Sequence, residues 1–408
     1  MQLLVKDPQG WRINGNSFQQ DALVTFGDYQ FLGGYTSERK VFLGRQSLQK
    51  DRGEWEFITF EDYVQTRDDG HNVVCLGVSG DGIIHIIWDL HNDVLNYRHS
   101  KVGVADMKDW HIDSFTEIFH NLSDELRLEK ATYPRFLRIP ETGELLLELR
   151  IGRSGLGDDY LFKYLPSSAQ WVPVGSNDGL YLKGVENNAY INGIDYAQGK
   201  LHVSWTYRDF VEDGGFSSVS QQAGPNGPEN NHDLYYAYSP DLGSTWYNTS
   251  GKQLELPIRP SDEIKVFTIP HNSGIMNQEG QTADSQGNFH VLNRENGFYY
   301  HYWRNQKGEW SRRQLNYEAV VFGDRGALIS DHQANLYALL PGNKNSTFTI
   351  LKATPSNDFL DWTVFYQEPG YFAEPTVDRY RSDRTLSIVQ TQAVNEQERY
   401  FGVLDLTL

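Results

Sequence analysis

The sequence has little cysteine, little methionine and no long apolar run, and each shortage narrows what the protein can be. One cysteine, Cys75, in 408 residues excludes an internal disulfide and a zinc site built from several cysteines. It stands in the apolar run 73–76, where we expect a small buried hydrophobic side chain. No run of about 18 apolar residues is present, so we expect no segment that spans a membrane.

Positive charge is also scarce. The chain has 36 Lys and Arg against 54 Asp and Glu, which gives a formal net charge of −18. This balance argues against nucleic acid and against an anionic membrane surface as partners. A polyanionic substrate must therefore meet a local cluster of Arg and His. The first residues do not read as a signal peptide, and because a processed chain would look the same, we expect a secreted or periplasmic mature chain.

Aromatic residues and glycine are abundant. The chain contains 24 Tyr, 21 Phe, 10 Trp and 37 Gly, a composition that favours strands and turns over helices. A length of 408 residues is too great for one ordinary domain unless the fold is repetitive. No linker is visible, and we expect a single domain over residues 1–408.

Two repeating signals indicate the fold. Tryptophans recur, mostly in short polar-flanked strands, at intervals of 44 to 75 residues, and a turn followed by an alternating apolar strand recurs about every 58 residues. Period-2 strands repeated at this length are typical of a β-propeller. We therefore expect an all-β fold, a seven-bladed β-propeller of four-stranded blades. The phased tryptophans are Trp11, Trp55, Trp110, Trp171, Trp246, Trp310 and Trp362.

The two ends of the chain are expected to meet in one blade. The last repeat unit, near Thr385, has no tryptophan after it, and Trp11 precedes the first unit. The N-terminal strand around Trp11 is therefore expected to supply the outer strand of the last blade, which leaves no open sheet edge.

Two other segments have clear local signatures. Residues 239–246 fit the Asp-box pattern Ser-x-Asp-x-Gly-x-Thr-Trp of sialidase-type propellers, which predicts a tight hairpin turn and a packed Trp246. The longest insertion runs from Asp209 to Asn231, and its composition predicts a mobile loop. Such a loop is either a lid over a site or a surface excursion.

Residues with acid–base chemistry gather between positions 70 and 157. His71 and His91 each precede an asparagine, and Tyr133 opens a strand before a proline, which favours extended backbone. Arg150 ends a strand before a glycine-rich turn. Histidine and tyrosine transfer protons, and the arginine fork matches a carboxylate. The combination predicts acid–base chemistry on an anionic substrate.

A second Tyr/Arg pair repeats the first one blade later. Tyr190 opens its unit as Tyr133 does, and Arg208 ends its strand as Arg150 does. Matched phase predicts that both pairs lie toward one face of the propeller. We assign catalysis to His71, His91, Tyr133 and Arg150, and substrate binding to Tyr190, Arg208, Asn72, Asn92 and Arg153.

These motifs resemble those of a known family over nearly the whole chain. They are Asp-Gly-His71-Asn, Trp-Asp-Leu-His91-Asn, Thr-Tyr133-Pro-x-Phe, Arg150-x-Gly-x-Ser-Gly-x-Gly, Ala-Tyr190-Ile-Asn and Asn231-His232-Asp233-Leu234. They are similar to motifs of the BNR-repeat propellers that contain the ulvan lyases of polysaccharide lyase families 24 and 25. The resemblance implies a seven-bladed propeller that cleaves ulvan, a sulfated rhamnose–uronate polysaccharide of green algae.

The resemblance also implies separate roles for the site residues. A His/Tyr set transfers protons in β-elimination, and an arginine neutralises the uronate carboxylate. Arg150 would stabilise the developing enolate, while His71, His91 or Tyr133 takes the C5 proton and Tyr133 or a histidine protonates the leaving oxygen. A phenol with a pKa near ~10 is a poor base unless a cation such as Arg150 lowers that value. The sequence leaves open which residue is the base and which is the acid.

Cofactor and partner expectations follow the same line. We expect an anionic polysaccharide substrate, a monomer, and no cofactor for the chemistry. Some relatives bind a structural metal through Cys and His. Such a divalent metal is possible here but not predicted, because Cys75 is the only cysteine and Tyr235 follows the His232 motif.

Two alternatives remain on the same fold. One is a glycoside hydrolase of sialidase or rhamnosidase type, which would use Tyr133 with Arg150 and Arg208. The other is a non-catalytic glycan-binding propeller, which would have no need for the two histidines. The products separate these functions, since a lyase creates a double bond, a hydrolase creates only reducing ends and a binding protein creates neither.

Overall fold

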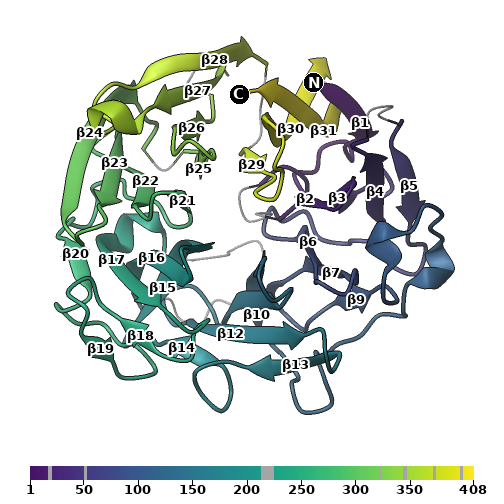
Figure 1. Ribbon diagram of the computed structural model, residues 1–408, viewed down its shortest axis with the longest axis horizontal. Coiled ribbons are helices and arrows are strands. Elements are labelled where there is room, and N and C mark those ends of the chain that lie inside the picture. Colours follow the sequence, from purple (N-terminus) through teal and green to yellow (C-terminus); the bar gives the residue numbers. More distant parts are fainter. Residues whose placement is uncertain are drawn as a thin grey trace. The chain divides into compact units, whose positions relative to one another are not determined.

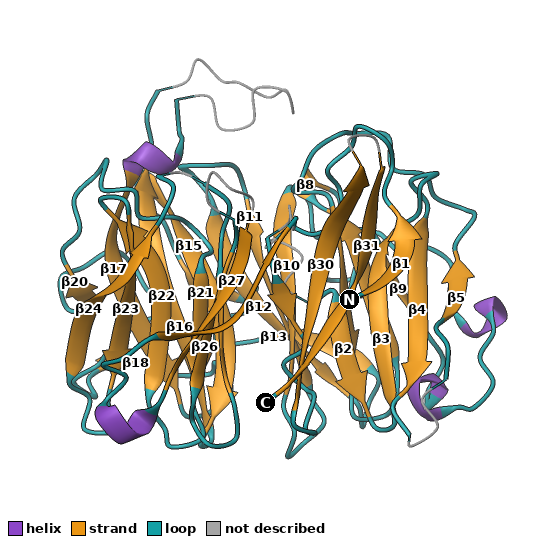
Figure 2. Cartoon of the chain, turned by 90° about the horizontal axis from the view of Figure 1, so that it is seen from above, coloured by secondary structure: helices purple, strands orange, loops and turns teal. Residues whose placement is uncertain are grey.

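The computed structural model is built almost entirely from antiparallel strands, with a few short 3-10 turns (Figure 2). None of the helices in the described part of the chain is long and apolar enough to cross a membrane. The residues that the structure describes are 1–16, 21–49, 53–212, 225–321, 323–342, 347–370, 374–395 and 398–408.

The chain divides into two compact units, called unit 1 and unit 2 below. Unit 1 comprises Met1–Leu149, Phe162–Val172 and Tyr371–Leu408. Unit 2 comprises Arg150–Leu161 and Pro173–Gly370. The expectation of a single domain stays a prediction.

Unit 1 contains three complete sheets (Figure 1). Their strand orders are β2-β3-β4-β5, β6-β7-β9 and β1-β31-β30-β29. The strands are β1 (Gln2–Lys6), β2 (Leu23–Phe26), β3 (Tyr29–Tyr35), β4 (Val41–Ser47), β5 (Glu56–Thr59), β6 (Val73–Val78), β7 (Ile84–Asp89), β9 (Tyr97–His99), β29 (Thr376–Val377), β30 (Thr385–Asn395) and β31 (Glu398–Thr407), and the 3-10 helices are η1 (Val104–Asp106) and η2 (Ile112–Ser114).

A further sheet contributes residues to both units. Its strand order is β13-β12-β11-β10-β8, and β14 pairs with β12. The strands are β8 (His91–Asp93), β10 (Ala131–Arg138), β11 (Leu145–Ile151), β12 (Asp158–Leu165), β13 (Gln170–Pro173) and β14 (Leu180–Leu182).

Unit 2 contains the other three sheets (Figure 1). Their orders are β15-β16-β17-β18-β19 with β20 on β17, then β21-β22-β23-β24 and β25-β26-β27-β28. The elements are β15 (Asn187–Ala197), β16 (Lys200–Asp209), η4 (Pro228–Asn230), β17 (Asn231–Ser239), β18 (Trp246–Tyr247), β19 (Gln253–Leu254), β20 (Lys265–Phe267), β21 (Gly280–Ala283), β22 (Phe289–Glu295), β23 (Phe298–Arg304), β24 (Trp310–Glu318), β25 (Ala327–Ser330), β26 (Leu336–Leu340), β27 (Thr347–Ala353), η5 (Pro355–Asn357) and β28 (Thr363–Pro369).

The described residues thus form seven sheets, the number predicted from the repeat, and the all-β propeller fold class is confirmed. Four sheets have four strands, while the others have three or six. Inner strands such as β6 and β26 are buried along their whole length, because both faces of a blade are covered. Cys75 lies in β6 with no exposed surface, as expected. A Cβ at Gly77 of the same strand would meet the Phe136 ring at 2.6 Å, so only glycine allows this approach.

The N-terminal strand closes the last sheet, as predicted, but it lies earlier than Trp11. Strand β1 pairs with β31, with Gln2 opposite Val403 and Lys6 opposite Tyr400. Trp11 itself follows the strand and has the Arg39 guanidinium 4.6 Å above its ring. The position of Trp11 in the repeat predicted the closing sheet correctly and the closing residues incorrectly, because its ring packs against the apolar cluster that contains Ile13 and Val24 and is not part of the strand.

The Asp-box hairpin forms as predicted. Asp241 accepts hydrogen bonds from the Ser239 hydroxyl (2.9 Å) and from the backbone and hydroxyl of Thr245 (both 2.8 Å). Gly243 has φ +97°, which favours glycine, and its carbonyl accepts from the buried Trp246 indole at 3.0 Å. The hydrogen bonds account for the sequence pattern. Of the long insertion predicted to be mobile, residues 213–224 lie outside the described part.

Candidate functional site

The two predicted catalytic histidines lie face to face in unit 1, and one buried carboxylate contacts both. The rings of His71 and His91 are stacked with centroids 3.9 Å apart and planes 13° apart. Nδ1 of His71 is 2.6 Å from Oδ1 of Asp69, and Nδ1 of His91 bonds to Oδ2 of the same carboxylate. The Asp69 side chain has 0% exposure, against 16% for His71 and 13% for His91. This carboxylate therefore fixes the orientation of both rings.

The Asp69 contact sets the protonation of each ring nitrogen. Burial alone would raise the pKa of Asp69, but the hydrogen bonds from His71 and His91 outweigh burial and hold that pKa below its ordinary value. An ionised carboxylate only accepts hydrogen bonds, so each ring carries a proton on Nδ1. The lone pair of a neutral ring is then at Nε2. This tautomer suits a general base.

Local backbone geometry brings these groups together. The His71 N–H donates to Oδ1 of Asp69 (3.0 Å), and the Asn72 N–H donates to the Asp69 carbonyl (2.9 Å), which closes a tight turn. On the other side, Asp89 and Leu90 have φ of 66° and 68°, a region that costs non-glycine residues energy. Such strained backbone is typical of functional loops.

Tyr133 joins the histidines, though with a backbone that differs from the prediction. Its ring centroid is 5.7 Å from that of His71, and its side chain is 4% exposed. It lies in β10, but its φ is 62°, so the extended geometry expected before a proline is wrong at this residue. The strained turn at Tyr133 is another positive-φ position next to the histidine pair.

The two asparagines next to the histidines have different surroundings. The Asn72 side chain is buried, and within the described residues its amide atoms have no hydrogen-bond partner. Asn92 is exposed, with φ 57°, and its N–H donates to the Thr132 hydroxyl at 2.8 Å. Their roles in substrate binding stay predictions.

A second group forms in unit 2 around Tyr190. The Arg150 guanidinium donates to the Tyr190 oxygen at 3.2 Å, and the Tyr190 hydroxyl donates to Ser154 at 2.9 Å. The Arg208 guanidinium lies 4.5 Å from the centre of the same ring. Burial alone would raise the pKa of Tyr190, but Arg208 and Arg150 lower it below its ordinary value. Arg150 thus acts on Tyr190, and its expected effect on Tyr133 stays a prediction.

Arg208 connects several segments of unit 2. Its side chain is buried, with 5% exposure. Its guanidinium donates to Asn231 Oδ1 (2.8 Å), Asn277 Oδ1 (2.7 Å), Ser154 Oγ (3.1 Å), the Asn226 carbonyl (3.1 Å) and the Tyr190 oxygen (3.4 Å). The predicted contact between Arg208 and substrate stays a prediction, and these bonds show that the residue also fixes the site around it.

The glycine-rich turn after β11 leaves room for the Arg150 side chain. A Cβ at Gly157 would be 2.6 Å from the Arg150 side chain and 2.4 Å from Asn188, so only glycine fits there. Arg153 of the same turn lies with its guanidinium 5.5 Å above the Phe210 ring.

The structure therefore brings the predicted residues together in two groups. His71, His91 and Tyr133 form one group in unit 1, and Arg150, Tyr190 and Arg208 form the other in unit 2. The convergence of both groups on one face stays a prediction. The sequence reasoning missed Asp69, for which the signal was an aspartate two residues before His71 at a glycine turn.

Unit 2 also contains a set of metal-ligand donors. Asp209, His232 and His271 place one ligand atom each within 4.8 Å of the others. Asp209 binds His232 Nε2 at 3.1 Å and His271 Nε2 at 3.0 Å. Two imidazole nitrogens and a carboxylate oxygen fit a divalent ion such as zinc. These residues would hold the metal without the cysteines whose absence led us not to predict one, and the metal would join the end of β16, the start of β17 and the segment after β20.

Comparison with known proteins gives a family and several relatives. A family model described as "BNR repeat-containing family member" matches residues 29–318. The chain is 27% identical to a long isoform of ulvan lyase from Pseudoalteromonas sp. (strain PLSV) over 67% of this chain and 31% of the relative. It is 28% identical to a short isoform from Alteromonas sp. (strain LOR) over 55% of this chain and 49% of the relative. The chain thus matches about a third to a half of the length of these curated relatives.

Solved structures share the fold. The polysaccharide lyase Uly1 superposes with a TM-score of 0.74 at 18% identity. The superposed region covers 97% of this chain and 91% of the Uly1 chain. A PL25 ulvan lyase bound to -[GlcA(1-4)Rha3S]- superposes with a TM-score of 0.71 at 14% identity. The superposed region covers 100% of this chain and 98% of the lyase chain. At these identities the likeness shows the fold, and it agrees with the seven sheets described above.

Proposed function

The chain belongs to the BNR repeat-containing family, and from this premise we propose that it is a polysaccharide lyase that cleaves a uronate-containing sulfated polysaccharide by β-elimination. The names of its relatives, ulvan lyases, support this activity. So does the glucuronate–rhamnose sulfate ligand named for one protein of the same fold. The observation that carries the proposal is the histidine pair on Asp69 beside Tyr133.

The stacked histidines suit proton transfer because they cannot easily share the same charge. Two imidazolium rings 3.9 Å apart repel each other by about 1 kcal/mol even in water, and by more in a partly buried site. Asp69, which contacts both rings through Nδ1, balances one positive charge on the pair. A neutral ring accepts a proton at Nε2 and a protonated ring donates one, so the pair holds both partners needed for an elimination.

The arginines of unit 2 suit the anionic part of the substrate. Removal of the C5 proton of a uronate leaves charge on its carboxylate as an enolate, and a guanidinium stabilises that charge with two parallel N–H donors. Arg150 is the residue proposed for this contact. Its bond to Tyr190 and the Gly157 approach keep the fork in a defined orientation.

In the proposed reaction, every bond that breaks is matched by a bond that forms. The C5–H bond breaks and its proton passes to a histidine or to Tyr133. The electron pair forms the C4–C5 double bond, and the C4–O bond breaks. The leaving oxygen takes a proton from Tyr133 or from the protonated histidine. No water enters the products, in contrast to hydrolysis.

The test is direct. The protein is incubated with a panel of polysaccharides, including a sulfated rhamnose–uronate polymer, an unsulfated uronate polymer and a neutral glucan. The absorbance of unsaturated uronate ends and the number of reducing ends are both followed. We expect both to rise together on the sulfated uronate polymer and neither on the glucan. Reducing ends without absorbance would mean hydrolysis, and binding without either would mean a lectin-like function.

A further inference from the structure

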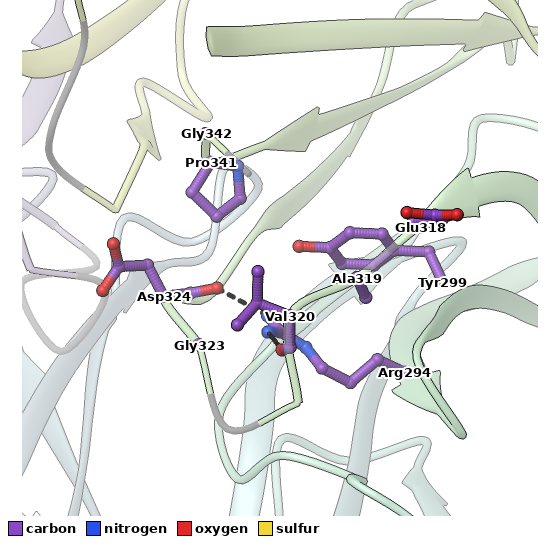
Figure 3. Close-up of a pocket in the computed structure, with 9 residues that line it drawn as sticks. All are labelled: Arg294, Tyr299, Glu318, Ala319, Val320, Gly323, Asp324, Pro341 and Gly342. Carbon is purple, nitrogen blue, oxygen red and sulfur yellow. Dashed lines mark hydrogen bonds between the residues drawn. The ribbon is translucent and has the colours of Figure 1, made fainter. Parts of the chain in front are cut away.

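A small pocket opens at the strand ends of unit 2, outside the groups described above (Figure 3). Its volume is about 270 Å³, slightly below the usual range of ligand pockets, which suits a small ligand. It lies where β22 ends, β23 begins and β24 ends, and Pro341, directly after β26, forms another wall. Neither the histidine group nor the Tyr190 group contributes a residue to it.

A buried arginine builds the pocket. Arg294 is 1% exposed and forms a two-point ion pair with Glu279, at 3.1 Å and 2.6 Å. The same guanidinium donates to the carbonyls of Val320 (2.8 Å) and Asp324 (2.6 Å). Figure 3 shows these two bonds beneath the pocket. Because one rigid side chain holds both wall residues, the pocket is formed before any ligand arrives.

The lining matches an uncharged, hydroxyl-rich ligand. Pro341 and the 43% exposed Val320 offer apolar surface to the C–H face of a sugar, and the Tyr299 ring, 3% exposed, forms part of the pocket wall (Figure 3). The exposed carboxylates of Glu318 and Asp324 accept hydrogen bonds from hydroxyl groups. The same carboxylates repel a sulfate or a second carboxylate. The pocket therefore selects against a charged sugar.

The pocket adjoins the arginines of unit 2. Arg325, which follows Asp324, donates to the Asn277 carbonyl at 2.7 Å. The side-chain oxygen of Asn277 accepts from Arg208 at 2.7 Å. One asparagine thus links the pocket wall to the group around Tyr190. An anionic chain bound along Arg208 would therefore extend toward the pocket wall at Arg325.

We propose that this pocket is a distal subsite that takes one uncharged sugar unit of the bound polysaccharide. The inference rests on the proposed lyase function and adds a preference to it, because it predicts stronger binding of chains that carry an unsulfated, non-uronate unit at this position. The catalytic step itself is not affected by the pocket.

Two adjacent valines give a matched test. Val320 lines the pocket and Val321 does not, although they are 43% and 46% exposed. Val320→Trp fills the pocket, whereas Val321→Trp adds the same bulk beside it. We expect KM for long chains to rise about fivefold in Val320→Trp, with kcat unchanged, and no change with the shortest oligosaccharide that is cleaved. Val321→Trp should match the wild type, and both variants should keep its melting temperature.

A second test changes the charge of the pocket wall. Glu318→Gln combined with Asp324→Asn should lower KM for fully sulfated chains more than for chains with unsulfated units, and Glu255→Gln, at an exposed position of the same unit, should not. Equal effects of Val320→Trp and Val321→Trp, in a wild type that forms unsaturated product, overturn the subsite alone. A wild type that forms no unsaturated product from any uronate polymer overturns the lyase function and the subsite with it.

Discussion

Asp69 shows how much depends on one side chain at the residue scale. A buried carboxylate with two imidazole Nδ1 atoms as partners sets the tautomer and the tilt of both rings. This is the role that a supporting carboxylate has in other acid–base sites, where it orients the imidazole without accepting its proton.

Asp69→Asn should therefore damage catalysis while leaving the fold intact. The amide has the same shape, but its nitrogen cannot accept from the second ring, so one histidine loses its tautomer. We expect kcat to fall by at least about 100-fold and its pH profile to change shape. Asp93→Asn is the control, since Asp93 pairs with Arg67 near the surface of the same unit. Similar losses in both variants would remove the special role of Asp69.

Tyr133→Phe removes a single hydroxyl next to His71. If that hydroxyl gives or takes a proton, turnover should fall by about 10²–10⁴-fold with little change in KM or melting temperature. Tyr29→Phe in the same unit is the control and should keep full activity. Retained turnover in Tyr133→Phe would leave proton transfer to the histidines alone.

Residue types were easier to predict than their contacts. The histidines, Tyr133 and the arginines were predicted from their places at strand ends. Asp69 was missed because a solvent-like run of acidic residues, Asp68 and Asp69, hides a buried side chain. The contact of Arg150 with Tyr190 was also missed, because it depends on how tightly the chain passes Gly157 and not on residue type.

The turn between β7 and β8 leads directly to His91 and is held by a buried acid. Asp89 accepts hydrogen bonds from the hydroxyls of Tyr35 and Tyr63 and from the Gln65 amide. Burial raises the pKa of Asp89 to about 6, and the hydrogen bonds offset only part of that effect. The charged groups that face it are Asp93 and Arg67.

The raised pKa of Asp89 predicts a pH dependence of stability. The folded state binds the proton of the Asp89 carboxyl more tightly than the unfolded state, in which the Asp89 pKa is 3.8. The favourable contribution, at most about 3 kcal/mol, is complete below pH 3.8 and is lost as the pH rises to about 6. In Asp89→Asn the difference in unfolding free energy from the wild type should therefore vary across this interval and be constant above about pH 7. Urea unfolding at several pH values measures this, and a constant difference throughout would contradict it.

Element boundaries followed the sequence pattern less closely than element types. The Asp-box turn was predicted residue by residue, because its hydrogen bonds are local. The closing strand was placed around Trp11 but lies at Gln2–Lys6, because a packed aromatic ring and a strand give the same signal in sequence. The positive φ of Tyr133 overrode the local preference for extended backbone before proline.

At the scale of the whole molecule, the repeat predicted the number of sheets because each blade repeats the same alternation of strand and turn. What the repeat could not give is which long-range contacts form, such as Asp209 with His271 or Arg208 with Asn277, since these join the end of β16 to the segment between β20 and β21. Contacts of this kind build both the metal-ligand group and the wall of the further pocket.

Both termini belong to one sheet, so the chain ends should matter for stability. Removal of residues 2–6 exposes the edge of β31 and uncovers the apolar cluster that Leu4 and Val5 pack against. We expect the melting temperature to fall by several degrees. Calorimetry of the truncated and full chains checks this, and an unchanged melting temperature would show that the closing strand contributes little.

We propose that the chain breaks its substrate by elimination. The most direct measurement is mass spectrometry of the oligosaccharides released from a sulfated rhamnose–uronate polymer in water labelled with oxygen-18. We predict unsaturated uronate ends, no heavy oxygen incorporated at the moment of cleavage, and a pair of products whose summed mass equals that of the starting chain. Saturated ends that carry one heavy oxygen per cleavage would contradict it and identify a hydrolase on the same fold.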